Sequence, residues 1–264
     1  MDGHRAPVRR RDALGAGVGL LAAAALTAGC AGGGGGGAAG AAGGPASSPP
    51  YEPSPAPAAP RRFPGLPVQI VHGPRNRPRV ALTFDGRGDP ELARTALARI
   101  ERAGARVTVL AVGSWLAEHP GMARRILDGG HEIGNHTEHH LDLAALDERA
   151  AYEEITTCAR RLRRLTGSIG TWFRPSPTPY ASPRVQRLAQ RAGYPHVLAC
   201  DVESLDHAAT GVAAVTRKVA GELRNGSVVG MSLGRPVTVA ALPLLLAEIG
   251  RRGLHAVTAT ELVS

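Results

Sequence analysis

The stretch Gly130-His131-Glu132-Ile133-Gly134-Asn135-His136-Thr137-Glu138-His139-His140 places four histidines within ten positions. His136 and His140 are four residues apart. In a helical turn this spacing puts both imidazoles on one side, where they reach a single divalent metal. The alternative is a solvated surface turn with no ligand role, because an isolated pair of histidines at this spacing is often coincidental.

The context of the histidines favours the metal site. An apolar, β-branched segment at residues 107–112 precedes them, followed by a helical stretch that ends in Asp128-Gly129-Gly130. The histidines then follow a short strand-like pair, Glu132-Ile133. Barrels that alternate strands and helices place their chemistry at the carboxyl ends of strands. We therefore predict that His136 and His140 bind a metal.

Strand-like and helical patterns alternate through the rest of the chain, with no internal repeat. We expect strands at residues 79–84, 106–112, 132–133, 170–173, 196–200, 227–231 and 255–259. We expect helices at residues 90–103, 114–127, 143–165, 183–192, 211–223 and 237–252. This alternation predicts a parallel α/β sheet or barrel.

The first 65 residues have the composition of a leader and a tether. Four arginines precede an apolar segment at residues 14–26 that is too short to span a bilayer, and Leu26-Thr27-Ala28-Gly29-Cys30 is typical of a lipobox. We predict a lipoprotein signal peptide over residues 1–29, lipidation of Cys30, and a Gly/Ala/Pro tether over residues 30–65. The alternative is a plain signal peptide that happens to contain Cys30. With the lipid, residues 66–264 form a domain anchored to the outer face of the cell membrane.

The net charge and the cysteine content limit the possible partners and disulfides of this chain. The net charge is +9, and the charges of the signal segment leave +7 on the remainder, nearly all from arginine. Such a surface favours anionic wall polymer or lipid headgroups, but genome composition is the preferred explanation of the arginine excess. Nucleic acid is not expected, because the chain is exported and aromatic residues make up only 3% of it. Cys158 and Cys200 either form a disulfide or remain two buried thiols.

Several short motifs, in the same order along the chain, resemble those of the polysaccharide deacetylases, the NodB-homology domain of carbohydrate esterase family 4. The motifs are Leu82-Thr83-Phe84-Asp85, the segment 128–143, Phe173-Arg174-Pro175, and the segments 201–206, 226–229 and 238–262. They cover nearly all of the globular part of the chain. The resemblance implies a distorted (β/α) barrel with somewhat fewer than eight strands.

The resemblance also implies a set of roles for the matching residues. Asp85 matches the general base and Arg174 its partner, while His136 and His140 match the metal-binding histidines. In this family a zinc- or cobalt-like divalent metal polarises water and the acetamide carbonyl. A backbone N–H then stabilises the oxyanion, and a late histidine acts as general acid.

Three positions of this chain depart from the family pattern. Gly86 stands where the second metal-binding aspartate belongs, and glycine has no ligand atom. Pro177 stands where the oxyanion N–H is expected, and proline has none. Ser232 replaces the late histidine. Asp89 and His207 are the residues that could stand in for the lost groups.

Two functions follow from this pattern. The inherited chemistry is metal-dependent hydrolysis of N-acetyl groups on cell-wall or chitin-like glycan, a hydrolase reaction on a carbon–nitrogen bond outside peptides, here with an eroded site. The alternative is an inactive glycan-binding or scaffolding protein on the same fold. Both expect an N-acetylated glycan as partner, and Gly86, Pro177 and Ser232 decide between them.

Overall fold

Strand β2 (Arg79–Gly88) lies at the centre of a sheet in which all paired strands are parallel. The computed structural model describes residues 60–264. The predicted signal peptide, Cys30 and the tether up to residue 59 lie outside the described residues. Within residues 60–264, no helix is long and apolar enough to cross a membrane.

The sheet runs in the order β4-β3-β2-β7-β6 and is extended by single bridges. Its further strands are β3 (Thr108–Ala111), β4 (Glu132–Asn135), β6 (Val202–Glu203), β7 (Val228–Gly234) and β8 (His255–Val257), which pairs with the start of β2. Phe173 bridges Asn135 on one side and Val197 on the other, which links β4 to β5 (Val197–Leu198) and β1 (Gln69–Ile70). No ladder among the described strands joins β1 to β6. The expected class, a distorted α/β barrel, is confirmed.

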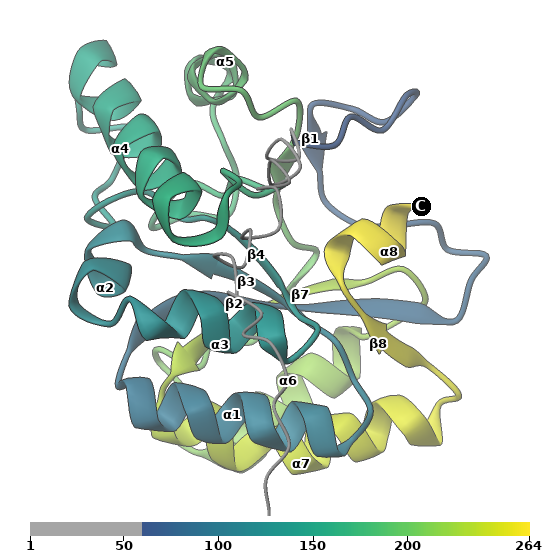
Figure 1. Ribbon diagram of the computed structural model, residues 1–264. Helices are drawn as coiled ribbons and strands as arrows, with labels where there is room; N and C mark the ends of the chain where they lie inside the picture. Colours follow the sequence, from purple (N-terminus) through teal and green to yellow (C-terminus); the bar gives the residue numbers. More distant parts are fainter. Residues whose placement is uncertain (1–59) are drawn as a thin grey trace, which may run out of the picture. The chain divides into compact units, whose positions relative to one another are not determined.

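Helices cover both sides of this sheet (Figure 1). Together on one side lie α1 (Pro90–Arg102), α6 (Val212–Glu222) and α7 (Pro236–Arg251). The others are α2 (Gly113–Glu118), α3 (Gly121–Asp128), α4 (Glu148–Thr166), α5 (Pro183–Arg191) and the C-terminal α8 (Ala259–Val263). Helix α8 adds Ala259 and Leu262 to an apolar cluster that fills the interior of the open barrel.

The alternation of side chains along β2 sorts its residues between two environments. Val80, Leu82 and Phe84 belong to the core cluster that packs against the helices. Ala81 belongs to the interior cluster, so the odd-numbered side chains of β2 point into the barrel. Asp85 has the same parity and sits near the carboxyl end of the strand, where the interior opens to solvent.

Several expected elements differ in extent from the observed ones, including the following three. Helix α4 begins at Glu148 rather than 143, because the Asp147 side chain accepts from the Ala150 N–H and caps the helix there. The single helix expected over 114–127 is two helices, separated at His119–Pro120, because proline cannot continue a helix begun before it. The strand expected over 170–173 is reduced to the Phe173 bridge.

The packed domain begins before residue 66. The ring of Phe63 stacks on Trp172, with centroids 5.4 Å apart and planes 4° from parallel. Its backbone N–H donates to Nε2 of His196 at 3.0 Å. Residues close to the predicted end of the tether therefore form part of the folded unit.

Gly134 allows β4 to approach the Trp172 segment, and we expect Gly134→Ala to destabilise the fold. A Cβ at this position would lie 2.6 Å from the Trp172 carbonyl oxygen, which also accepts the Asn135 N–H. Overpacking of this kind costs about 1–3 kcal/mol of unfolding free energy, measurable by urea denaturation. Gly121→Ala is the control, since nothing lies within 4 Å of its added Cβ. Equal stability of the two variants would contradict the close approach.

Candidate active site

The loop that follows β4 carries the histidines, and a buried asparagine fixes its start. The Asn135 amide donates to the Ile155 carbonyl and to the Tyr194 hydroxyl, and its oxygen accepts the Thr137 N–H. Thr137 and His140 adopt left-handed backbone angles, with φ of 67° and 59°. The expectation of a helical turn is therefore wrong, because side-chain hydrogen bonds and two left-handed residues shape an irregular loop instead.

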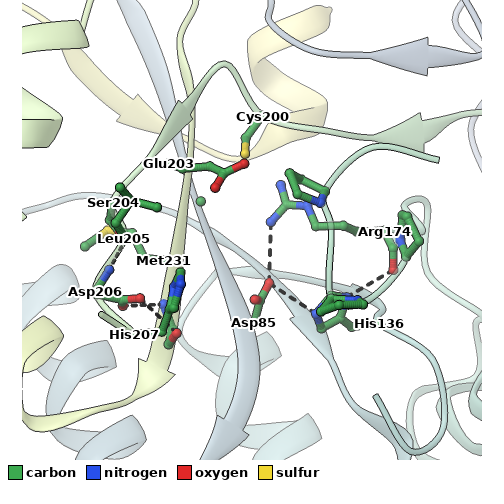
Figure 2. Close-up of a pocket in the computed structure, with 15 residues that line it drawn as sticks. Asp85, His136, Arg174, Cys200, Glu203, Ser204, Leu205, Asp206, His207 and Met231 are labelled. Carbon is green, nitrogen blue, oxygen red and sulfur yellow. Dashed lines mark hydrogen bonds and ion pairs between the residues drawn. The ribbon is translucent and has the colours of Figure 1, made fainter. Parts of the chain in front are cut away.

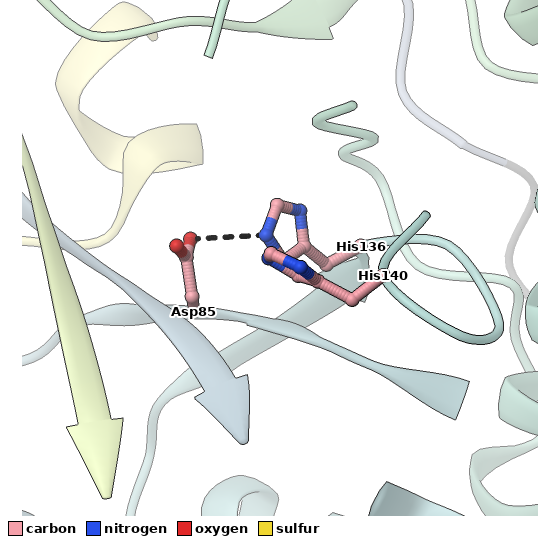
Figure 3. A group of neighbouring side chains, drawn as sticks. All are labelled: Asp85, His136 and His140. Atoms are coloured by element: carbon pink, nitrogen blue, oxygen red, sulfur yellow. Dashed lines mark ion pairs between the residues drawn. The ribbon is translucent and has the colours of Figure 1, made fainter. Parts of the chain in front are cut away.

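The loop nevertheless brings His136 and His140 together with Asp85 (Figure 3). One ligand atom from each of the three lies within 4.8 Å of the others. Nε2 of His136 lies 3.4 Å from Oδ1 of Asp85. Two imidazoles and a carboxylate are a common ligand set for a catalytic zinc ion, so the composition of the cluster fits a divalent metal.

The tautomer of His136 also fits a metal ligand. Its Nδ1 lies 3.0 Å from the Arg174 carbonyl oxygen, which only accepts, so Nδ1 must donate. In the neutral ring the lone pair then sits on Nε2, which is buried and has no hydrogen-bond partner. Metal-bound histidines are oriented in this way by a carbonyl on the other nitrogen.

Charge holds Asp85 ionised. Burial raises the pKa of its carboxyl, but the neighbouring His136, Arg174 and His140 together outweigh burial and leave the pKa below its ordinary value. Nη1 of Arg174 lies 3.6 Å from Oδ1 of Asp85. Arg174 thus lies beside Asp85 (Figure 2).

His140 is neutral at physiological pH. Burial, His136 and the guanidinium of Arg87 lower the pKa of His140 to about 4. Nη1 of Arg87 lies 3.0 Å from Nδ1 of His140. Because arginine has donors only, Nδ1 must be the acceptor. His140 therefore carries its proton on Nε2, the opposite tautomer to that of His136.

Gly86 contributes no ligand, and its position on β2 faces away from the histidines. A Cβ at residue 86 would lie 2.8 Å from Cγ1 of Val109 and 3.0 Å from Cα of Ala111. Both Val109 and Ala111 belong to the core on the helix side of the sheet. A side chain at 86 would thus enter the packed core unless the strand shifts.

A small pocket of about 90 Å³ opens beside Asp85. Ordinary small-molecule pockets measure roughly 300–1,000 Å³, so this one holds a small group, such as one acetamide of a larger polymer. Its lining includes Asp85, His136, Arg174, Pro177, Cys200, Glu203, Asp206, His207 and Ser232 (Figure 2). Pro177 offers no N–H there.

Ser232, which replaces the late histidine of the family pattern, is hydrogen-bonded to Asp206. The Ser232 hydroxyl donates to Oδ1 of Asp206 at 3.0 Å, and its backbone N–H donates to Oδ2 at 2.7 Å. The Thr238 hydroxyl also donates to Oδ2 of Asp206. This buried carboxylate is therefore satisfied by its own structural donors.

The two stand-in residues have different surroundings. Asp89 caps α1, with Oδ1 accepting the N–H groups of Glu91 and Leu92, and it does not line the pocket. His207 lines the pocket and is exposed. His207 can thus reach the site, whereas Asp89 would first have to break its two hydrogen bonds to the start of α1.

Sequence reasoning missed three residues of the site: Asn135, Arg87 and Glu203. Asn135 lies inside the histidine motif, directly before His136. Glu203 follows the expected strand 196–200, the signal that identifies Asp85. Nothing in the sequence indicates the contact of Arg87 with a loop 53 positions away.

Both cysteines of the described residues are free and buried, so the disulfide alternative does not hold. Burial raises the pKa of Cys200 to about 11. Its thiol is therefore neutral in the pocket wall and is a poor metal ligand.

The described residues form an α/β barrel with an Asp/His/His cluster, and comparison with known proteins identifies the family. The family model described as polysaccharide deacetylase matches residues 72–197. A peptidoglycan-N-acetylglucosamine deacetylase of Bacillus cereus is 30% identical over 194 residues, which are 72% of this chain and 90% of that protein. The chain belongs to the polysaccharide deacetylase family.

Three further comparisons show a similar sequence or the same fold. The peptidoglycan-N-acetylglucosamine deacetylase PgdA of Listeria monocytogenes is 28% identical over 74% of this chain, and the chain spans only 41% of its length. A family 4 pseudoenzyme from Bacillus anthracis has the same fold, with a TM-score of 0.70, 22% identity, and coverage of 75% of this chain and 70% of that one. A mutant of that pseudoenzyme, described as having restored enzymatic activity, also has a TM-score of 0.70.

Asn135 positions the histidine loop, and we expect Asn135→Ala to lower the unfolding free energy by about 2–4 kcal/mol, since unpaired buried groups cost about 1–3 kcal/mol each. The substitution leaves the Ile155 carbonyl and the Thr137 N–H without these partners. Asn225→Ala, which removes only the bond to the Arg75 carbonyl, is the control and should cost about 1 kcal/mol or less. Denaturant titration of both variants measures the difference, and a cost no greater than that of the control would refute the anchoring role.

Restoring a carboxylate at Gly86 meets a packing obstacle. We expect Gly86→Asp to lower the unfolding free energy by about 1–3 kcal/mol, because the new side chain starts 2.8 Å from Val109. The matched control is Gly211→Asp, at the N-cap of α6, where nothing lies within 4 Å and aspartate is a favoured cap. Thermal unfolding compares the two, and a Gly86→Asp variant as stable as the control would show that residue 86 has room for the carboxylate.

Proposed function

We propose that this chain binds the N-acetyl groups of a cell-wall or chitin-like glycan and turns them over negligibly. One observation carries the proposal: the cluster has a single carboxylate, Asp85, where the family chemistry needs two. Hydrolysis needs one carboxylate to complete the metal ligands and another to accept a proton from water. Asp85 cannot do both at once.

The remaining catalytic groups support the same conclusion. Pro177 has no N–H for an oxyanion, and loss of one such donor costs about 10²–10³ in rate. The Ser232 hydroxyl is held by Asp206, and loss of a general acid costs about 10²–10⁴. Such losses need not be additive, but together they leave little of an ordinary turnover.

Recognition is less affected than turnover. The pocket keeps the ionised Asp85, the guanidinium of Arg174 and the free Nε2 of His136. A zinc- or cobalt-like ion would be held by Asp85, His136 and His140, and it would supply a Lewis acid for the acetamide oxygen. The relatives named as peptidoglycan-N-acetylglucosamine deacetylases point to N-acetylated wall glycan as the ligand class.

We further propose that the domain acts at the outer face of the cell membrane. The basic and apolar leader, the lipobox-like word ending in Cys30 and the Gly/Ala/Pro segment after it support a lipid-anchored placement. A glycan-binding domain on such a tether would stay close to the wall polymer.

Binding and acetate release, measured on one preparation, test the proposal. We expect the purified protein to bind an N-acetylglucosamine oligomer by calorimetry and to bind its chemically de-N-acetylated form at least about tenfold more weakly, because the acetyl group is what the small pocket holds. We expect acetate release at least about 10³-fold below that of an active family member assayed in parallel.

The acetylated and de-N-acetylated oligomers share one sugar backbone, and they differ in the acetyl groups and in the free amines that de-N-acetylation leaves. Acetate release at the rate of the active relative would overturn the non-catalytic proposal. Equal affinity for both oligomers would overturn the acetyl-binding proposal.

A further inference from the structure

Among the described residues, His140 is the hydrogen-bond partner of the Arg87 side chain. Nη1 of Arg87 donates to Nδ1 of His140 at 3.0 Å. No carboxylate of the described residues forms an ion pair with this half-buried guanidinium. Arg87 follows Gly86 directly, so it extends from the end of β2 towards the histidine loop.

This bond and metal binding at His140 exclude each other. If a metal binds Nδ1, it takes the lone pair that Arg87 now uses. If a metal binds Nε2, the proton of the neutral ring must move to Nδ1, and an N–H then faces the N–H of Arg87. Whichever nitrogen is used, the guanidinium has to leave first.

His136 shows the contrasting arrangement. Its Nδ1 faces a carbonyl acceptor, which leaves Nε2 ready for a ligand. The two histidines of one cluster thus have partners of opposite polarity. The acceptor on His136 favours metal binding, and the donor on His140 opposes it.

Charge acts in the same direction as the hydrogen bond. Arg87 and Arg174 each bring a positive charge to the cluster, and Asp85 brings a single negative charge. The guanidinium of Arg87 beside His140 therefore repels a divalent cation at this ligand. Gly86 adds no carboxylate next to it.

We propose that Arg87 is an internal competitor of the metal, which holds His140 in the tautomer that cannot bind it and keeps the site metal-free at rest. A metal enters only when the Arg87 side chain turns away from His140. This inference rests on the ligand set named in the proposed function. It adds a residue that controls metal affinity without itself being a ligand.

Zinc titration of Arg87 variants tests the inference. We expect Arg87→Met and Arg87→Gln to bind zinc about 10- to 100-fold more tightly than the wild type, the range that partners of metal-bound histidines usually control. The Gln variant offers an oxygen that accepts from Nδ1–H, and the Met variant removes the donor alone. Neither substitution removes another bond of the side chain, so both variants should fold, as circular dichroism would verify.

Two controls separate this effect from general charge. Arg94→Met removes the same charge from an exposed arginine that pairs with Glu91, and it should leave zinc affinity unchanged. Adding His140→Ala to Arg87→Met should remove the gain. Unchanged affinity in the Arg87 variants, absence of binding in wild type and variants alike, or a gain that survives His140→Ala would overturn the inference.

Nitrogen NMR of the metal-free protein gives an independent readout. We expect His140 to carry its proton on Nε2 in the wild type and to lose this preference in Arg87→Gln, while His136 stays protonated on Nδ1 in both. A wild-type His140 protonated on Nδ1 would contradict the inference. These readouts need no turnover, so failure of acetyl binding and failure of the Arg87 competition would be told apart.

Discussion

The buried guanidinium of Arg174 is the contact on which the site depends. Its side chain is almost fully buried, and a charge so placed must be satisfied by hydrogen bonds. Nε donates to the Leu198 carbonyl, and Nη2 donates to the Thr83 hydroxyl and the Ala199 carbonyl. Arg174 thereby holds its own segment, which bridges β4 at Phe173, to the centre of β2 and the end of β5.

The backbone of Arg174 extends the same network to the histidine loop. Its N–H donates to the Asn135 carbonyl, and its own carbonyl accepts from Nδ1 of His136. Nη1 is left to face Asp85. One residue therefore orients the histidine, stabilises the ionised carboxylate and bridges strands that no continuous ladder connects. Replacing it would disturb all three functions at once.

The residues that form the cluster could be predicted from the sequence, but their geometry could not. Asp85, His136, His140 and Arg174 stand in words that follow strands, and parallel strands bring such positions to one edge of the sheet. The helical turn was wrong because Asn135 bonds the loop from within. The metal-ligand role of Asp89 has no support from its placement, since an aspartate just before a helix is a favoured N-cap.

Contacts between segments far apart in the chain could not be predicted from the sequence. Side chains alternate along the strand from Val80 to Phe84, so the sequence alone predicts that residue 86 faces the helices. The bond from Arg87 to His140 could not be predicted, because it depends on the left-handed backbone at His140. The position of Ser232 beside Asp206 likewise follows from the pairing of β6 with β7.

Several polar side chains around the site already have hydrogen-bond partners. Ser232 is bonded to Asp206, Asp89 to the start of α1 and Arg87 to His140. Among the buried side-chain atoms of the described residues, Nε2 of His136 and Nε2 of His131 have no hydrogen-bond partner. Only the former faces the pocket. Nε2 of His136 lies 3.4 Å from Oδ1 of Asp85 without a hydrogen bond, so a ligand at this atom would break none. The physical case for a binding site therefore rests on His136, even where the case for catalysis is lost.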